Sequence, residues 1–454
     1  MEKTYSLTSG NILTSLIKFA FPVLIALFLQ ALYGGVDLLI VGQFAHTSDV
    51  SGVATGSMLL QTVTMIITGL SMGVTILVGE QTGRREPKEA GKSIGSGIYM
   101  FAFIAVFLTV LMLFGAESFA KILHAPKEAF EETVLYIRIC GSGSIFIVSY
   151  NLLGAVFRGI GDSKTPLITV AIACVINILG DLLLVAVFHM GAAGAAAATV
   201  AAQAISVLVS IVMIMKKNLP FHMSRKYISF NRRRIFLELK LGTPVALQEF
   251  LVGISFLVIQ TVVNNFGVTA SAGVGVAEKV CVFLMLVPSA YMQSMSAFVA
   301  QNMGTGNPLR AKKALGYGII TAFAAGLIMG TIAFFYGDML SSIFSEDPAV
   351  IAASHNYLKA YAIDCLLTPF LFCFMGYYNG CERTLFVMIQ GIIGAFLVRI
   401  PVVYFISQST GATLFHIGLG TPASSFVQIS LCIGMFVYLE KKSDKCYTKR
   451  KLKH

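Results

Sequence analysis

Charged residues are scarce in this chain. Only 12% of its 454 residues are charged, whereas 56% are hydrophobic, and the mean hydropathy is +0.80. This leaves too little polar surface to cover a soluble globule of this length, so the composition excludes a soluble domain. Apolar runs of roughly 18 to 28 residues recur between polar breaks, and each is long enough to cross about 30 Å of hydrocarbon as a helix. We therefore predict an integral membrane protein.

The cysteines and histidines lack the spacings of a metal site. Eight cysteines are scattered along the chain without a C-x-x-C pair, which indicates small apolar packing residues and neither a metal site nor a disulfide framework. None of the seven histidines lies four residues from another, so no H-E-x-x-H motif is present. Residues 1–10 contain no positively charged region leading into a cleavable signal. We expect no cofactor, no structural metal and no removable signal, and an enzyme is the least favoured class.

The apolar runs are organised as a repeat. Val78–Ala90 and Val299–Ala311, which lie 221 positions apart, share Val, Gly, Pro and Ala at the same offsets, and the same shift pairs Gly159 with Gly380. Such self-similarity indicates one unit built twice. Each half holds six spans, so both copies enter the membrane from the same side, which predicts an all-α membrane protein with twelve transmembrane helices in two parallel six-helix repeats. The expected spans are 14–42, 52–79, 93–116, 132–157, 166–188, 192–215, 238–264, 274–300, 315–336, 356–380, 385–407 and 414–439.

The basic residues set the expected boundaries and orientation. The net charge of +11 is concentrated in alternate loops, in the centre of the chain and at its end, while the intervening loops are nearly bare. This distribution argues against nucleic acid as a partner and places both termini in the cytoplasm by the positive-inside rule. We expect an N-terminal lobe over 1–216, a cytoplasmic linker over 217–236, a C-terminal lobe over 237–440 and a basic cytoplasmic tail over 441–454.

Two acidic residues of the first half lie inside expected spans. Asp37 is near the outer end of span one, and Asp181 in span five follows Asn177 by four residues, so Asn177 and Asp181 share a helix face. Placing Asp in the middle of a membrane helix costs about 2.5 to 3.5 kcal/mol, so two such residues need a reason. Leu397 and Pro401, or Val398 and Val402 with the shift of 221, occupy the positions that match Asn177 and Asp181 in the second half, so the repeat kept the scaffold without these polar groups.

Three interpretations of this acidic pair remain open. Buried carboxyl groups close to each other favour the protonated form, so the pair could bind a proton on one side of the membrane and release it on the other. Ionised Asp37 and Asp181 with the Asn177 carbonyl would instead offer hard oxygen ligands for Na⁺. In the third interpretation the two acids only hydrogen-bond neighbouring helices.

Other polar residues and two prolines are weaker signals. Gln248 and Glu249 in span seven, with Asp364 in span ten, could form a second polar site, but none has a partner at helical spacing. Pro22 and Pro244 lie inside spans one and seven, where proline bends a helix, and either could act as a hinge or as a passive kink.

Several motifs together resemble one known family. The twelve spans, Val36–Gly42 around Asp37, the Gly-x-x-x-Pro loops after spans two and eight, Arg158–Pro166 and Asn177-x-x-x-Asp181 resemble the multidrug and toxic compound extrusion (MATE) transporters. The first half is most similar to the DNA-damage-inducible protein F type and related bacterial drug exporters. The resemblance implies export of amphipathic, often cationic, organic compounds by alternating access of two lobes, coupled to H⁺ or Na⁺. It also implies a multi-pass protein of the plasma (inner) membrane, and we expect a monomer within the lipid bilayer.

The resemblance also implies a cation site. Carried over residue by residue, the first-lobe site of the family falls on Asp37, Asn177, Asp181 and Thr199, with Tyr136 nearby. The acid that some branches place eight residues after the proline of span seven is Val252 here, and Glu249 lies one turn earlier. A second-lobe cation site is therefore left open.

Two other functions were weighed beside cation-coupled export. A lipid-linked saccharide flippase of the same superfamily would need cationic side chains inside the cleft, and spans one to six supply little beyond Arg138. A channel is disfavoured because two unequal halves provide no ring of identical filter residues.

Overall fold

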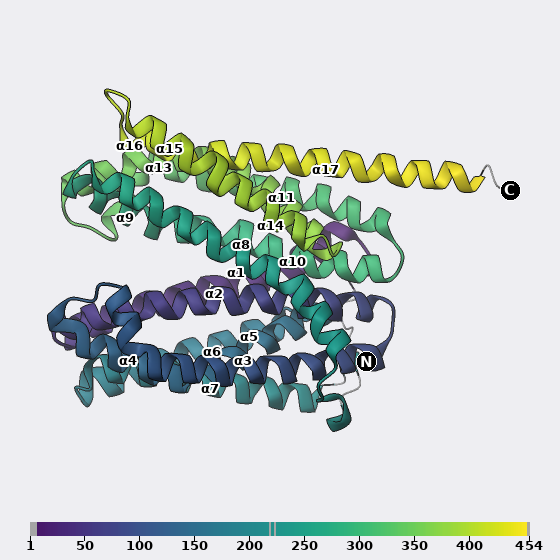
Figure 1. Ribbon diagram of the computed structural model, residues 1–454, viewed down its shortest axis with the longest axis horizontal. Coiled ribbons are helices and arrows are strands. Elements are labelled where there is room, and N and C mark those ends of the chain that lie inside the picture. The colour runs from purple at the N-terminus through teal and green to yellow at the C-terminus, as the bar shows by residue number, and fades with distance from the viewer. Residues whose placement is uncertain (1–6, 218, 222–223, 452–454) are drawn as a thin grey trace. The chain divides into compact units, whose positions relative to one another are not determined.

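The structure is a computed structural model that describes residues 7–217, 219–221 and 224–451, and these residues form helices and turns without a strand. The first half contains α1 Ile12–Phe44, α2 Thr47–Gly83, α3 Pro87–Ile122, α4 Phe130–Ser142, α5 Ser144–Ile160, α6 Lys164–Asp181, the π-helix η2 Leu182–Val187 and α7 Gly191–Lys216 (Figure 1). The second half contains α8 Arg232–Asn264, α9 Val268–Leu284, α10 Leu286–Gly304, α11 Pro308–Phe335, α12 Gly337–Ser342, α13 Pro348–Gly380, α14 Thr384–Ile392, the π-helix η4 Ile393–Arg399, α15 Ile400–Ser407, α16 Leu414–Gly418 and α17 Gly420–Lys451. Two 3₁₀ turns, η1 Lys127–Ala129 and η3 Arg225–Tyr227, lie in connections.

The number of spans agrees with the sequence expectation once two bends are counted. Among the described residues, 10 helices are long and apolar enough to cross a membrane, and the number reaches 12 if each of two bent helix pairs is one span. Residues 127–142 meet α5 at 54°, and α9 meets α10 at 40°. The expected spans 132–157 and 274–300 are therefore each broken. Gly143 stands at the first break, where a Cβ atom would lie 2.5 Å from the side chain of Val200.

Two expected boundaries need correction. The linker over 217–236 ends earlier than predicted, because α8 already begins at Arg232; the side chain of Asn231 accepts a hydrogen bond from the Arg234 amide at 3.2 Å, as a helix cap does. The expected tail over 441–454 is not separate, because α17 continues to Lys451. Lysine and glutamate are good helix formers, so the change from apolar to basic residues does not end a helix.

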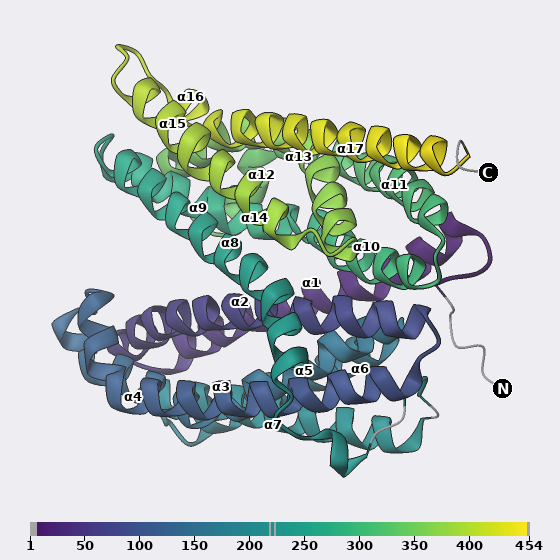
Figure 2. The ribbon, with the colours of Figure 1, turned by 45° about the vertical axis from the view of Figure 1, so that its right-hand side comes forward.

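The chain divides into two compact units that do not follow the repeat. Unit 1 contains the described residues up to 250 with 293–314 and 379–384, and unit 2 contains 251–292, 315–378 and 385 onward. Helix α8 is one continuous helix that contributes to both units (Figure 2). The two six-helix lobes therefore remain a prediction from the sequence.

Unit 1 is held together by close helix packing. Helix α6 packs on α7 and α1, and α2 packs on α5 and α4. An apolar core that includes Val74, Phe101 and Phe157 lies among α2, α3 and α5. This core leaves α1, α6 and α7 to surround the polar residues described below.

The internal repeat appears in unit 1 as a reciprocal contact between α2 and α10. A Cβ atom at Gly83 would lie 2.0 Å from the carbonyl oxygen of Gln301, and one at Gly304 would lie 2.1 Å from the carbonyl oxygen of Glu80. The shift of 221 positions pairs Gly83 with Gly304 and Glu80 with Gln301. The same contact is therefore made twice with its partners exchanged, and only glycine permits such an approach of two backbones.

A second pair of glycines repeats this relation. A Cβ atom at Gly159 would lie 2.9 Å from the Thr75 carbonyl oxygen, and one at Gly380 would lie 2.7 Å from the Ser296 carbonyl oxygen. Thr75 and Ser296 are also 221 positions apart. The Gln301 amide donates a hydrogen bond to the Gly159 carbonyl at 2.8 Å, which ties α10 to α5.

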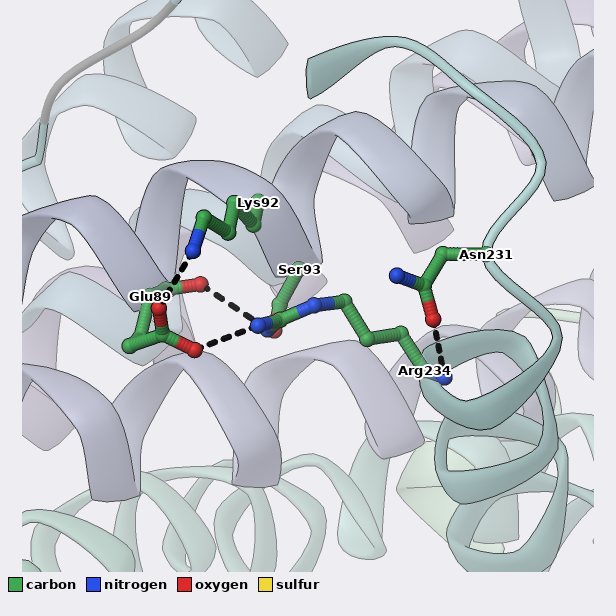
Figure 3. Close-up of polar contacts among 5 residues, drawn as sticks. All are labelled: Glu89, Lys92, Ser93, Asn231 and Arg234. Atoms are coloured by element: carbon green, nitrogen blue, oxygen red, sulfur yellow. Dashed lines mark hydrogen bonds and ion pairs between the residues drawn. The ribbon is translucent and has the colours of Figure 1, made fainter.

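The start of α8 is fastened to α3 by Arg234 (Figure 3). Its guanidinium donates to the Glu89 carboxylate, to the Glu89 carbonyl at 3.3 Å and to the Ser93 hydroxyl at 2.9 Å. Lys92 pairs with the other carboxylate oxygen of Glu89 at 2.7 Å. One of the basic residues in the first turn of α8, Arg234, therefore makes a specific structural contact.

A turn between α5 and α6 is closed by Asp162. Its carboxylate accepts hydrogen bonds from the amides of Lys164 at 3.1 Å and Thr165 at 3.0 Å, and it pairs with Lys217 Nζ at 3.0 Å. Burial alone would raise the pKa of Asp162, but the bonds from Thr165 and Lys217 outweigh it and lower the pKa. Because the folded-state pKa is depressed, the stability from this carboxylate is present above its ordinary pKa of 3.8 and is lost as the pH falls below that value.

We expect Asp162→Asn to lower the free energy of unfolding by about 1 kcal/mol near pH 7, because asparagine keeps the turn geometry but loses the charge-assisted bonds. The measurement is the apparent melting temperature of the detergent-purified protein as a function of pH. The difference from the parent protein should shrink below pH 4, where the parent carboxylate becomes protonated. Glu346→Gln, which changes an exposed carboxylate, is the control. A difference that persists unchanged at low pH would contradict this account.

Candidate functional site

Two buried carboxyl groups form the centre of the candidate site. Asp37 on α1 is 6% exposed, and Asp181, the last residue of α6, is 0% exposed. The two groups are close enough to share a hydrogen bond when one carries a proton. When both are ionised, neither Asp181 oxygen has a donor among the described residues. Two adjacent buried negative charges are unfavourable, so this arrangement favours the uptake of a cation.

The polar groups beside the acids come from α6 and α7. Asn177 lies one turn before Asp181, and its amide donates to the Thr199 hydroxyl of α7 at 3.5 Å. The Asn177 carbonyl oxygen is buried without a donor among the described residues. A Cβ atom at Gly180 would lie 2.9 Å from the Ala198 Cβ, so small residues bring the two helices together here. The structure thus gathers Asp37, Asn177, Asp181 and Thr199 within unit 1.

The local backbone changes form directly after Asp181. The α-helical pattern of α6 ends there and the π-helix η2 continues the segment. Such a segment widens the helix by one residue per turn and frequently occurs at functional sites. Periodicity in the sequence predicted a regular helix through Asp181 and did not reveal this change.

Tyr136 enters the same region from α4. It is 2% exposed, and its ring packs against Gly56 of α2, where a Cβ atom would lie 2.4 Å from the ring. Its hydroxyl is close enough to Asp37 to experience the charge of that carboxylate. Tyr136 thus lies near Asp37, and its part in a cation site remains a prediction.

Unit 1 contains two small cavities, of which the smaller is lined by two of the polar residues beside the acids. A cavity of about 10 Å³ is lined by Asn177 and Thr199, together with Tyr33, Tyr150 and Gln203. A larger cavity of about 70 Å³ shares Tyr150 and has a mixed polar and apolar wall. The smaller one has room for about one water molecule, so the polar groups beside the acids reach a space that water or an ion can enter.

Several residues of this region were missed by sequence reasoning. Tyr33, Tyr150 and Gln203 are polar side chains inside expected spans, and Arg158 lies one residue beyond the expected span 132–157; all four line one of the two cavities. The Tyr33 hydroxyl interacts with Gln30 and Gln203. Each of these residues could have been noticed in the sequence, because polar side chains are costly in lipid. The apolar spans have no amphipathic pattern, however, so the sequence did not show which polar side chains face the same space.

The residues expected for a second polar site do not group as a trio within one unit. Gln248 and Glu249 lie in the part of α8 that belongs to unit 1, whereas Asp364 belongs to unit 2. Within unit 2, Asp364 interacts with Ser425 and lies near Arg399.

Arg399 is a buried cation of unit 2. It is 6% exposed and donates to the Ser255 hydroxyl at 3.1 Å. Its guanidinium lies 4.5 Å from the centre of the Phe256 ring. Glu278 on α9, which sequence reasoning did not single out, also lies in unit 2 with one buried oxygen that has no donor among the described residues.

The two prolines lie inside continuous helices. Pro22 is buried in α1, and Pro244 is partly buried in α8. Neither helix ends at its proline, so a hinge role for these residues remains a prediction.

A multi-span helical protein with paired carboxyl groups and polar cavities inside its helices has the construction of a secondary transporter. The family follows from comparison with known proteins. The MatE family profile matches residues 22–183 and 244–405, one segment in each half. The chain belongs to the MATE family, whose members are transporters and not enzymes.

Individual relatives agree with this assignment over nearly the whole chain. The probable multidrug resistance protein YpnP of Bacillus subtilis is 28% identical over 458 residues, covering 99% of this chain and 100% of the relative. The multidrug export protein MepA of Staphylococcus saprophyticus is 23% identical over 424 residues, covering 91% of each. A crystal structure of MATE in complex with MaL6 has a TM-score of 0.90 at 18% identity, covering 99% of this chain and 100% of that chain. The predicted fold class and family are confirmed; the finer likeness to the DNA-damage-inducible protein F type remains a prediction.

Proposed function

We propose that this protein is a cation-coupled antiporter that exports amphipathic, often cationic, organic compounds by alternating access. The observation that carries the proposal is the Asp37–Asp181 pair, which is buried without donors for both Asp181 oxygens among the described residues. Membership of a transporter family, with relatives named as multidrug resistance and multidrug export proteins, supports the class of substrate. We further propose that the protein works as a monomer in the plasma (inner) membrane with both termini in the cytoplasm.

The acidic pair couples the two fluxes through its charge. Without a cation, the facing carboxylates repel each other, and α1 and α6 separate or admit water. With a proton or Na⁺ bound, the repulsion is lost and the two helices can close. If the closed form binds substrate more weakly, cation entry from outside drives substrate release, and by linkage substrate binding inside favours cation release.

The same residues offer a place for either coupling ion. A proton would be shared between Asp37 and Asp181, which are already close enough for one hydrogen bond. Na⁺ would be held by the oxygens of Asp37, Asp181 and Asn177, and the undonated Asn177 carbonyl oxygen suits a hard cation.

The test is transport of rhodamine 123, a cationic amphipathic dye, in proteoliposomes with proton and Na⁺ gradients imposed separately. We expect saturable dye movement that one of the two gradients accelerates and that the matching ionophore abolishes. Liposomes without protein serve as the control. Saturable movement that neither gradient alters would refute coupling, and movement that rises linearly with dye concentration would indicate a channel.

A further inference from the structure

Arg158 is a cation of unit 1 that has no anionic partner among the described residues. It lies in the last turn of α5, and among the described residues no hydrogen bond or ion pair reaches its guanidinium, while its Nε is buried without an acceptor. The side chain lies back along its own helix, since a Cβ atom at Gly154 would be 3.2 Å from Nη1. Arginine remains charged in proteins, and the Arg158 side chain is only partly exposed, so this positive charge lacks a neutralising carboxylate among the described residues.

The guanidinium lines the cavity of about 70 Å³, whose wall contains no Asp or Glu. Its polar lining is neutral and includes Gln30, Thr68, Tyr150 and Asn151. The Asn151 carbonyl oxygen already accepts the Thr68 hydroxyl at 2.8 Å, and its amide donates to the Ile147 carbonyl at 2.9 Å. The lining of this cavity therefore contains one positive charge, that of Arg158, and no carboxylate that could balance it.

The nearest acid in the sequence is engaged elsewhere. Asp162, four residues after Arg158, accepts bonds from Thr165 and pairs with Lys217. The acidic pair of the candidate site likewise does not line this cavity, although Tyr150 lines both this cavity and the smaller one. Arg158 and the acids are thus separate charged sites of opposite sign in one unit.

The size of the cavity limits what can balance the charge. A cavity needs about 10 to 15 Å³ to hold one water molecule, so a cavity of about 70 Å³ holds a few waters or one small anionic group. The planar fork of a guanidinium matches a carboxylate with two parallel hydrogen bonds.

We propose that Arg158 and this cavity bind the carboxylate group of exported compounds, so that zwitterionic amphiphiles carrying a carboxylate are bound in preference to the corresponding esters. The proposal rests on the proposed export function, since it assigns a recognition role within the same transport cycle. It adds a selectivity determinant of opposite charge to the cation-coupling pair.

The test uses two dyes that differ only at this group. Rhodamine 110 carries a free carboxylate, and rhodamine 123 is its methyl ester. Binding to the purified protein in detergent, followed by fluorescence anisotropy with no ion gradient, should be about tenfold tighter for rhodamine 110. Arg158→Gln should remove this preference while changing rhodamine 123 binding less than twofold. Arg158→Lys should keep part of it, because the charge remains but the fork is lost.

The matched control is Arg138→Gln, which removes an arginine whose side chain is 47% exposed and paired with Glu117 at 2.9 Å. It should leave the preference intact. Should both Arg158 variants fail to fold, competition on the parent protein decides: benzoate should displace rhodamine 110 and benzamide should not. Equal binding of both dyes by the parent protein, an undiminished preference in Arg158→Gln, or equal competition by benzamide would overturn the proposal.

Failure of this inference can be told apart from failure of the export function. Gradient-driven movement of rhodamine 123 in proteoliposomes does not require a carboxylate. If that movement persists while the carboxylate preference is absent, only the role of Arg158 is refuted. If no gradient drives either dye, the export function itself is refuted.

Discussion

We expect Asp181→Asn to abolish gradient-driven export while the protein remains folded. The side chain is 0% exposed, and neither carboxylate oxygen has a donor among the described residues, so the charge on Asp181 is sensed mainly by Asp37. Asparagine has the same shape but takes up no proton, and its amide can donate to Asp37 permanently. The variant should therefore stay in one arrangement of α1 and α6 whatever the gradient.

The expected magnitude follows from the size of the coupling. Coupling free energies of 1 to 3 kcal/mol correspond to effects of about 5- to 150-fold, so the acceleration by the gradient should fall from this range to none. Removing an uncompensated buried carboxylate should also raise the apparent melting temperature, by the equivalent of about 1 to 3 kcal/mol. The measurements are rhodamine 123 flux in proteoliposomes with and without a gradient, and thermal unfolding in detergent.

Asp37→Asn and the double variant complete this experiment. Because the two carboxyl groups act on each other, we expect each single variant to lose the coupling and the double variant to lose no more, which is the behaviour of a pair acting as one unit. Glu346→Gln controls for the loss of an exposed carboxylate. Gradient-driven flux that survives in Asp181→Asn at normal expression would remove this pair from the mechanism.

We expect Gly83→Ala and Gly304→Ala each to destabilise the protein strongly, although alanine is the better helix former. The added Cβ atoms would lie 2.0 Å from the Gln301 carbonyl oxygen and 2.1 Å from the Glu80 carbonyl oxygen, distances that no side-chain rotation can relieve. The helix-propensity gain of about 1 kcal/mol is outweighed by the backbone displacement, since overpacking alone costs about 1 to 3 kcal/mol. We expect a melting temperature at least several degrees lower, or no folded protein.

The control for this pair is Gly316→Ala, because among the described residues no heavy atom lies within 4 Å of a Cβ atom built there. It should be neutral or slightly stabilising. The double variant Gly83→Ala with Gly304→Ala should lose less than the sum of the single losses, since both open the same contact between α2 and α10. Tolerance of either single substitution equal to that of Gly316→Ala would show that the backbones are not in close contact.

Much of the acidic site could be predicted from the sequence, because an acidic residue inside a membrane span has a high energetic cost. Asp37 and Asp181 stand out since acids are expensive in lipid, and the spacing of four residues correctly placed Asn177 on the face of Asp181. Thr199 and Tyr136 have no such signal, because hydroxyl groups are common in membrane helices. They were expected only through the family resemblance, and the structure places them beside the acids.

The surroundings of Arg158 could not be predicted from the sequence. It stood in a motif that contributed to the family resemblance, at the end of an expected span, where a basic residue is ordinarily explained by snorkelling to the membrane surface. Only the packing of neighbouring helices shows that the side chain is directed into a cavity without an acid. The opposite holds for Arg138, whose exposed side chain pairs with Glu117 as an ordinary surface residue does.

The sequence by itself determined that the chain is a membrane protein of two homologous halves, because hydropathy and a 221-residue shift are properties of residue order alone. It also determined which glycines repeat, without saying why. Only the tertiary structure showed that Gly83 packs against α10 and Gly304 against α2 in a reciprocal backbone contact. It also showed the bend of 54° between α4 and α5, and it placed Arg158 and the two acids in separate sites. These depend on which helix faces meet, and nearly uniform apolar spans carry little information about their own faces.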